Sequence, residues 1–207
     1  IAIGILVNMG IIKCENIKEY VFIGELSLNG KINKINGILP MCIEAKKLGI
    51  NKIIIPKENE KEASIVKDIR IIGVKTLNDL IKYLNGDIVI KSERINVEDL
   101  LNNTNNYKLD FSEVKGQENI KRALEVAAAG GHNCLLIGNP GSGKTMMARR
   151  LPTILPDLTF EEALEVTKIH SIAGLLDTNQ AIINTRPFRS PHHTISGVSL
   201  VGRRQNS

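Results

Sequence analysis

The stretch "LLIGNPGSGKTMMARR", residues 135–150, passes from apolar residues through a glycine-rich turn to a lysine and a threonine. It satisfies the pattern G-x-x-x-x-G-K-[ST], in which backbone N–H groups cradle phosphate. The fixed positions are Gly138, Gly143, Lys144 and Thr145. Before them, "CLLI" (134–137) is typical of a short buried strand, and "KTMMARRL" after them is typical of the start of a helix. The glycines therefore stand where a strand turns sharply into a helix.

The motif predicts a binding site for ATP and Mg²⁺. Lys144 would reach the β- and γ-phosphates, and the hydroxyl of Thr145 would be a ligand of Mg²⁺. The predicted ATP-binding residues are Gly138, Asn139, Pro140, Gly141, Ser142, Gly143, Lys144 and Thr145. The alternative is a glycine turn with a surface lysine, against which the complete motif and its strand–helix context argue.

The composition is that of a globular protein. With 207 residues, of which 43% are hydrophobic, the chain can form one or two domains with real cores. No apolar run reaches the roughly twenty residues of a membrane helix and no signal sequence opens the chain, so we expect a cytoplasmic protein. Cys14, Cys42 and Cys134 are odd in number and lie in apolar stretches, which predicts buried, reduced thiols and no structural metal.

The net charge of +5 would suit a polyanionic partner such as nucleic acid. However, Lys, Asn and Ile are abundant throughout the chain, a bias that genome-wide base composition also produces. Aromatic residues make up only 3%, and no basic stripe with interleaved aromatics is visible. Both interpretations of the charge stay open.

Hydrophobic patterning divides the chain into two units. In the first, apolar runs predict strands over 21–28, 52–56 and 69–74, and helical patterns cover 38–49, 58–68 and 76–86. This alternation predicts an α/β domain over residues 1–87. Residues 88–108 are rich in Asn and charge, which predicts a linker. The second unit then covers residues 109–207.

Capping signals define the helices of the second unit. A helix with a small-residue face precedes the apolar run and should end at Gly130 and Gly131. A further helix should begin at Thr159, with Glu162 completing a reciprocal capping arrangement. Prolines in the basic tail (183–207) predict an extended or looped segment.

Three stretches of the second unit, residues 123–156, 161–175 and 186–202, together resemble the magnesium-chelatase-like AAA+ ATPases, and within them the bacterial competence-protein-M type. The resemblance implies an α/β P-loop domain that binds ATP and Mg²⁺. It also implies a homo-oligomeric ring that acts on DNA in recombination or competence. Gly116 and Gln117 resemble the stretch that AAA+ proteins place beside the adenine.

The first unit looks like the proteolytic domain of Lon-type peptidases over residues 24–59. Chelatase subunits usually lack such a front domain, so it favours the competence-protein-M type. The peptidase serine would fall at Ile1 and its lysine at Leu39, and neither side chain can attack a carbonyl or take a proton. Lys46 and Lys47 lie nearby, but an exposed helix face explains them better than a relocated dyad. We therefore expect a non-proteolytic Lon-like module.

The tail offers charged candidates. Arg186 and Arg189 could contact a nucleotide, a neighbouring subunit or DNA phosphate, or they could simply pin a structural loop. His192 and His193 are adjacent in an extended segment, where neighbouring side chains point to opposite sides, so a shared metal ion is disfavoured.

The sequence departs from the family after residue 202. Arg203 and Arg204 stand where the family usually has glycines, and no apolar strand ending in Asp-Glu follows the loop. The acidic strand, the sensor residues and the subunit-crossing arginine are therefore missing, and no catalytic residue is predicted. We expect a fragment truncated at both ends that binds nucleotide weakly without useful hydrolysis. The alternatives for the parent are a metal-chelatase motor of tetrapyrrole synthesis and a nucleotide-binding module without hydrolysis.

Overall fold

The computed structural model describes residues 1–92, 107 and 109–191. The chain divides into two compact units, one of residues 1–104 with 158–184, the other of residues 105–157 with 185–207. Residues 158–184, which the sequence assigns to the second domain, thus pack with the first unit. Most of the expected linker (88–108) lies outside the described residues.

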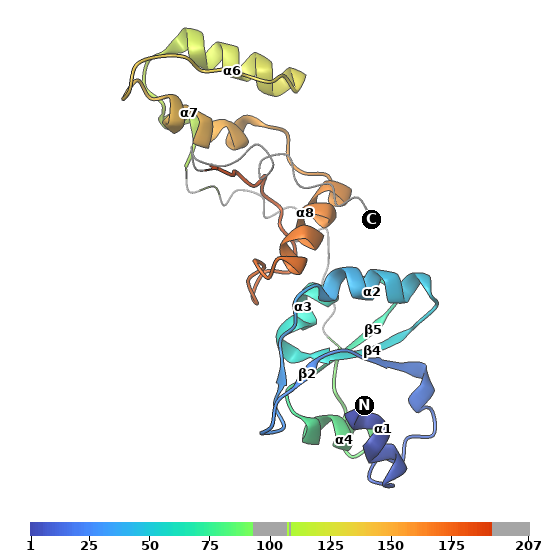
Figure 1. The fold of residues 1–207 in the computed structure, drawn as a ribbon. Coiled ribbons are helices and arrows are strands. Elements are labelled where there is room, and N and C mark those ends of the chain that lie inside the picture. Colours follow the sequence, from blue (N-terminus) through green and yellow to red (C-terminus); the bar gives the residue numbers. More distant parts are fainter. Residues whose placement is uncertain (93–106, 108, 192–207) are drawn as a thin grey trace, which may run out of the picture. The chain divides into compact units, whose positions relative to one another are not determined.

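The first unit is a mixed α/β fold on a parallel sheet with strand order β1-β4-β5 (Figure 1). The strands are β1 (Tyr20–Phe22), β4 (Lys52–Pro56) and β5 (Arg70–Val74). A small antiparallel pair, β2 (Glu25–Leu26) and β3 (Ile32–Asn33), follows β1. The single strand expected over 21–28 is therefore divided, because its first part pairs with β4 and its second part pairs with β3.

Helices cover both faces of this sheet. They are α1 (Ala2–Asn8), α2 (Ile38–Lys47), α3 (Glu60–Ala63) and α4 (Leu77–Leu84), with single turns η1 (Ile17–Glu19) and η2 (Lys57–Asn59). Successive strand residues point to opposite faces, so Ile53 and Ile55 of β4 pack in the cluster of α2 and α3. Ile54 packs in the opposite cluster, with α1 and α4. Burial on both sides explains the continuous apolar run of this strand.

Helix α8 (Phe160–Ile172) belongs to the first unit. Ala163 is buried in the same cluster as α2, and the buried hydroxyl of Thr167 accepts from the backbone N–H of Ile183 at 2.9 Å. The predicted capping box is confirmed, since Thr159 and Glu162 cap each other's backbone N–H. The helix is therefore fixed at its start by its own side chains and along its length by the first unit's core.

The charged helix expected over 58–68 is short, and several of its polar residues are buried. The side chain of Asn59 hydrogen-bonds the backbone of Ile35 at 3.1 and 2.9 Å. Glu62 accepts from the backbone N–H of Leu39 at 3.1 Å and from the hydroxyl of Ser171. These polar groups point into the protein because they satisfy donors near the first turn of α2 and the last turn of α8.

The second unit is helical in its described part. It contains η3 (Phe111–Glu113), α6 (Glu118–Gly130), α7 (Lys144–Arg150) and η4 (Leu151–Ile154), shown in Figure 1. A small core joins Phe111, Val114, Leu124 and Met147. Helix α6 ends as predicted, with Gly131 at a φ of +64°, a backbone conformation that glycine adopts without a Cβ penalty.

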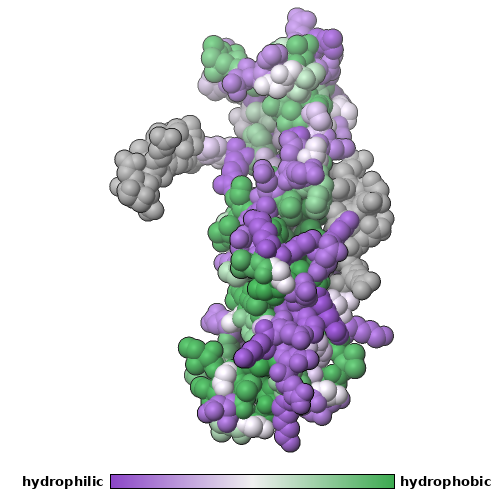
Figure 2. Space-filling view, turned by 90° about the vertical axis from the view of Figure 1, so that its right-hand side faces the viewer, coloured by the Kyte–Doolittle hydropathy of each residue, from purple (hydrophilic) through white to green (hydrophobic). Residues whose placement is uncertain are grey.

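The predicted strand over 134–137 is wrong, because these residues have no regular secondary structure. Leu135 and Ile137 are 84% and 87% exposed, whereas Leu136 packs against the small core. A strand requires a neighbour to pair its N–H and C=O groups, and the described part of this unit contains none. Figure 2 shows apolar side chains at the surface in the upper part of the view, where α6 lies in Figure 1.

Candidate functional site

The glycine-rich loop leads into α7 through left-handed backbone. Gly141 has a φ of +79° and Gly143, the N-cap of α7, a φ of +88°. Residues with a Cβ rarely adopt such positive φ angles. A Cβ at Gly143 would also lie 3.3 Å from the terminal methyl of Met146. Glycine at these two positions therefore follows from the geometry of the turn.

Lys144 curls back over the loop that precedes it. Its Nζ donates to the carbonyl oxygens of Gly138 and Asn139, each at 2.7 Å, and to Ser142 Oγ at 3.2 Å. Thr145 follows in the first turn of α7 and is exposed. The fold thus brings together the ammonium group, the loop backbone and an exposed hydroxyl, and the two carbonyls that hold the lysine belong to the loop itself.

Gln117 reaches the same loop from the start of α6. It adopts a φ of +56°, and its Nε2 donates to the carbonyl of Ser142 at 3.3 Å. The segment that resembles the adenine-side stretch of AAA+ proteins therefore touches the loop, although the two are 25 residues apart in sequence.

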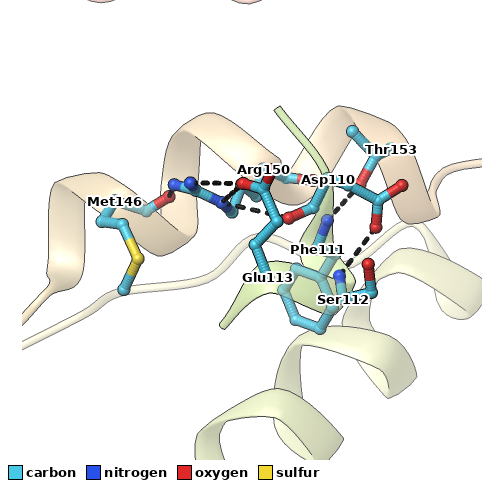
Figure 3. A network of polar contacts seen from close by, with 7 residues as sticks. All are labelled: Asp110, Phe111, Ser112, Glu113, Met146, Arg150 and Thr153. Carbon is cyan, nitrogen blue, oxygen red and sulfur yellow. Dashed lines mark hydrogen bonds and ion pairs between the residues drawn. The ribbon is translucent and has the colours of Figure 1, made fainter. Parts of the chain in front are cut away.

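Arg150 anchors α7 from the other end, a role that sequence analysis missed (Figure 3). Its guanidinium donates to Glu113 Oε2 at 2.6 and 3.1 Å and to the carbonyl of Asp110 at 3.0 Å. The partners are 37 and 40 residues away, so no local pattern could have identified them. The side chain and backbone of Ser112 hydrogen-bond Asp110 and lower the pKa of its carboxyl. The helix that carries Lys144 is thus tied to the segment before α6.

The two arginines of the tail differ. Arg186 Nε donates to the carbonyl of Pro156 at 2.6 Å, and its backbone N–H donates to Tyr107 Oη at 2.9 Å. Arg186 thus links the segment around Pro156 to Tyr107, and a role toward nucleotide, subunit or DNA stays a prediction. Arg189 is exposed. His192, His193, Arg203 and Arg204 lie outside the described residues.

The first unit brings no nucleophile and base together at the positions of the peptidase dyad. Leu39 is fully buried in the core, and Ile1 is exposed. Lys46 pairs with Asp68 and Lys47 with Glu44, both at 2.9 Å on the surface. These exposed ion pairs are what an ordinary helix face presents.

Cysteine burial was predicted only in part. Cys42 is buried, and that burial, together with the nearby Glu62 carboxylate, raises the pKa of its thiol to about 12. Cys14 is half-buried, but Cys134 is exposed because the strand expected around it does not form. All three are free thiols.

Two negative findings apply to the described residues. None of their His, Cys, Asp and Glu side chains cluster in threes as a metal site would require. The helices among them are too short or too polar to cross a membrane.

Comparison with known proteins places both parts of the chain. Residues 110–207 match the family model of magnesium chelatase, subunit ChlI, and residues 1–59 match a second model, subunit ChlI of Mg-chelatase. Competence protein ComM of Haemophilus influenzae is 38% identical over 98% of this chain and 40% of its own length. YifB of Escherichia coli is 40% identical over 98% of this chain and 39% of its own.

An uncharacterized protein of Mycobacterium tuberculosis is 43% identical over 91% of this chain and 37% of its own length. The chain thus spans well under half the length of these relatives. Both of its ends match ChlI models, and ComM and YifB align over almost all of it. The chain belongs to the magnesium-chelatase ChlI-like AAA+ family, of the type that includes ComM and YifB.

Proposed function

We propose that residues 138–145 bind the triphosphate of ATP together with Mg²⁺. The observation that carries the proposal is the position of Lys144, whose ammonium lies over the loop with two backbone carbonyls as its closest acceptors. Phosphate oxygens would replace those carbonyls and form stronger, charge-assisted hydrogen bonds. The loop's N–H groups would bind the same anion, and Thr145 would offer its hydroxyl to Mg²⁺. ATP and Mg²⁺ are also what this AAA+ family binds in general.

We further propose that the first unit is a non-proteolytic Lon-like module and that the loop opens a AAA+ domain. The whole protein would be a ring-forming motor that acts on DNA in recombination or competence. Support comes from the relative that is named competence protein ComM. The name of both family models favours a second candidate, a chelatase motor of tetrapyrrole synthesis. Stimulation of ATP turnover by DNA in the longer protein would favour the DNA motor, and its absence would favour the chelatase.

Calorimetric titration of the chain with Mg²⁺-ATP tests the loop assignment. Lys144→Ala removes charged hydrogen bonds and should weaken binding about 10- to 150-fold. Lys115→Ala is the matched control, because it removes an exposed lysine from the same unit and should leave the affinity unchanged. Equal ATP affinity in a folded Lys144→Ala variant would disprove the proposal.

A further inference from the structure

The second unit contains a hollow of about 280 Å³ that the ATP proposal does not use. Three stretches of the chain that are far apart in sequence line this hollow. Tyr107 and Leu109 come from the segment before η3, Arg149 and Pro152 come from α7 and η4, and residues 185–188 close the other side. The hollow thus combines aromatic rings, prolines and guanidinium groups.

One wall of the hollow is fixed by backbone hydrogen bonds. Arg186 donates from its side chain to the carbonyl of Pro156 and from its backbone to the hydroxyl of Tyr107. Both the arginine and the tyrosine therefore have defined positions before any ligand arrives. A preformed wall reduces the ordering cost of binding.

Besides Arg186, the hollow is lined by the guanidinium group of Arg149, and a further arginine, Arg189, follows the lining residue Phe188 in sequence. Arg149 and Arg189 are both exposed. Within the described ranges, neither guanidinium group makes a hydrogen bond or an ion pair. A guanidinium fork in this state is suited to phosphate oxygens, which it can bind in a bidentate manner.

Phe188 supplies an apolar surface in the same hollow as Arg149. It lines the hollow and remains 44% exposed, between Pro187 and Arg189. Exposed aromatic rings beside unpaired arginines are the combination with which proteins bind single strands, where bases stack on the rings and phosphates meet the cations.

We propose that this hollow binds single-stranded nucleic acid, with one base held against Phe188 and an adjoining phosphate at Arg149. The inference rests on the proposed function, which calls for a nucleic-acid partner, and it assigns that partner a site. A single strand is favoured over a duplex because paired bases are stacked on each other and present only their edges.

The test is fluorescence anisotropy of a labelled oligothymidylate of about 12 nucleotides, titrated with the 207-residue chain at low salt. Phe188→Ala should weaken binding roughly 5- to 150-fold, and Phe188→Tyr, which keeps a stacking ring, should restore it. Arg149→Ala should weaken binding and reduce the slope of log affinity against log salt by about 0.7. Arg122→Ala, which removes an exposed arginine paired with Glu125 on α6, is the matched control and should have little effect.

Several results would overturn this site. The oligonucleotide would show no measurable binding, or Phe188→Ala would bind it as tightly as the original chain does. Displacement of the oligonucleotide by ATP would likewise rule the site out. Polyglutamate binding with the same dependence on Phe188 would also overturn it, since the site would then select acidic peptide. ATP affinity, measured separately, distinguishes the two proposals. If it stays dependent on Lys144 while oligonucleotide binding fails, only the inference about the hollow is lost.

Discussion

Glu62 joins three parts of the first unit, and Glu62→Ala is expected to loosen all of them. Glu62 as a whole is 5% exposed. Oε1 accepts from the backbone N–H of Leu39, near the start of α2, and from the hydroxyl of Ser171, near the end of α8. Oε2 lies 3.4 Å from the side-chain amide of Asn59. The variant therefore leaves a donor of α2 and a donor of α8 without an acceptor, whereas the amide of Asn59 keeps its hydrogen bond to the carbonyl of Ile35.

The size of the effect follows from two opposing contributions. Each buried donor left unsatisfied costs about 1–3 kcal/mol, so the N–H of Leu39 and the hydroxyl of Ser171 together cost about 2–6 kcal/mol. Removing a buried carboxylate also relieves its desolvation penalty, which is several kcal/mol before its hydrogen bonds offset it. We expect a net loss of about 3 kcal/mol in the free energy of unfolding, within a typical total of about 5–15 kcal/mol.

Urea unfolding followed by tyrosine fluorescence measures this loss, because Tyr20 and Tyr83 pack edge to face at 6.4 Å in the first unit. With a denaturant slope of about 2 kcal/mol per molar urea, the midpoint should fall by about 1.5 M. Glu58→Ala is the control, since its exposed pair with Lys31 at 3.3 Å is worth at most about 1 kcal/mol. If the urea midpoint of Glu62→Ala equals that of the original chain, the hydrogen bonds accepted by Glu62 do not stabilise the first unit.

Three other predictions concern pH, proteolysis and hydrolysis. The free energy of unfolding should fall between pH 9 and about 12, because the pKa of Cys42 is raised from 9.0 to about 12 in the folded state and the unfolded chain releases the proton first. Cys42→Ala should lose this part of the pH profile in urea titrations, and an unchanged profile would count against it. An unstructured protein substrate should stay intact with the chain, since Leu39 stands where the peptidase lysine belongs; cleavage that disappears in Lys46→Ala would show a misplaced dyad. Phosphate release from Mg²⁺-ATP should not exceed that of Lys144→Ala, because Lys144 contacts only oxygens of the loop and pairs with no carboxylate among the described residues, whereas phosphoryl transfer needs acidic groups that position Mg²⁺ and water; robust turnover dependent on Lys144 would contradict this.

Two kinds of element could be predicted from the sequence: strands that are buried on both faces, and helices whose ends are stabilised by neighbouring residues. The apolar run over 52–56 is β4, and the helix expected over 38–49 is α2, which ends two residues earlier. The capping box at Thr159 needed only the local pattern. The motif likewise located Lys144 next to the loop that its side chain contacts.

Features that depend on distant partners could not be predicted. The run over 134–137 has the apolar character of a strand, but it has no paired neighbour among the described residues. Glu62 lies in a charged stretch for which only a helix was predicted, and its partners Leu39 and Ser171 are 23 and 109 residues away. The ion pair of Arg150 with Glu113 likewise joins residues that are far apart in sequence, 37 positions in this case. Charge alone does not tell whether a side chain faces water or a buried donor.

If the backbone of residues 138–145 binds the phosphates of ATP, its N–H groups become hydrogen-bonded to the ligand. Amide hydrogen exchange of the chain, measured residue by residue with and without Mg²⁺-ATP, tests this binding most directly. We predict that ATP slows exchange at Gly141, Gly143, Lys144 and Thr145, and that this protection disappears in Lys144→Ala. Protection that lies elsewhere in the chain, or that persists in Lys144→Ala, would contradict the assignment.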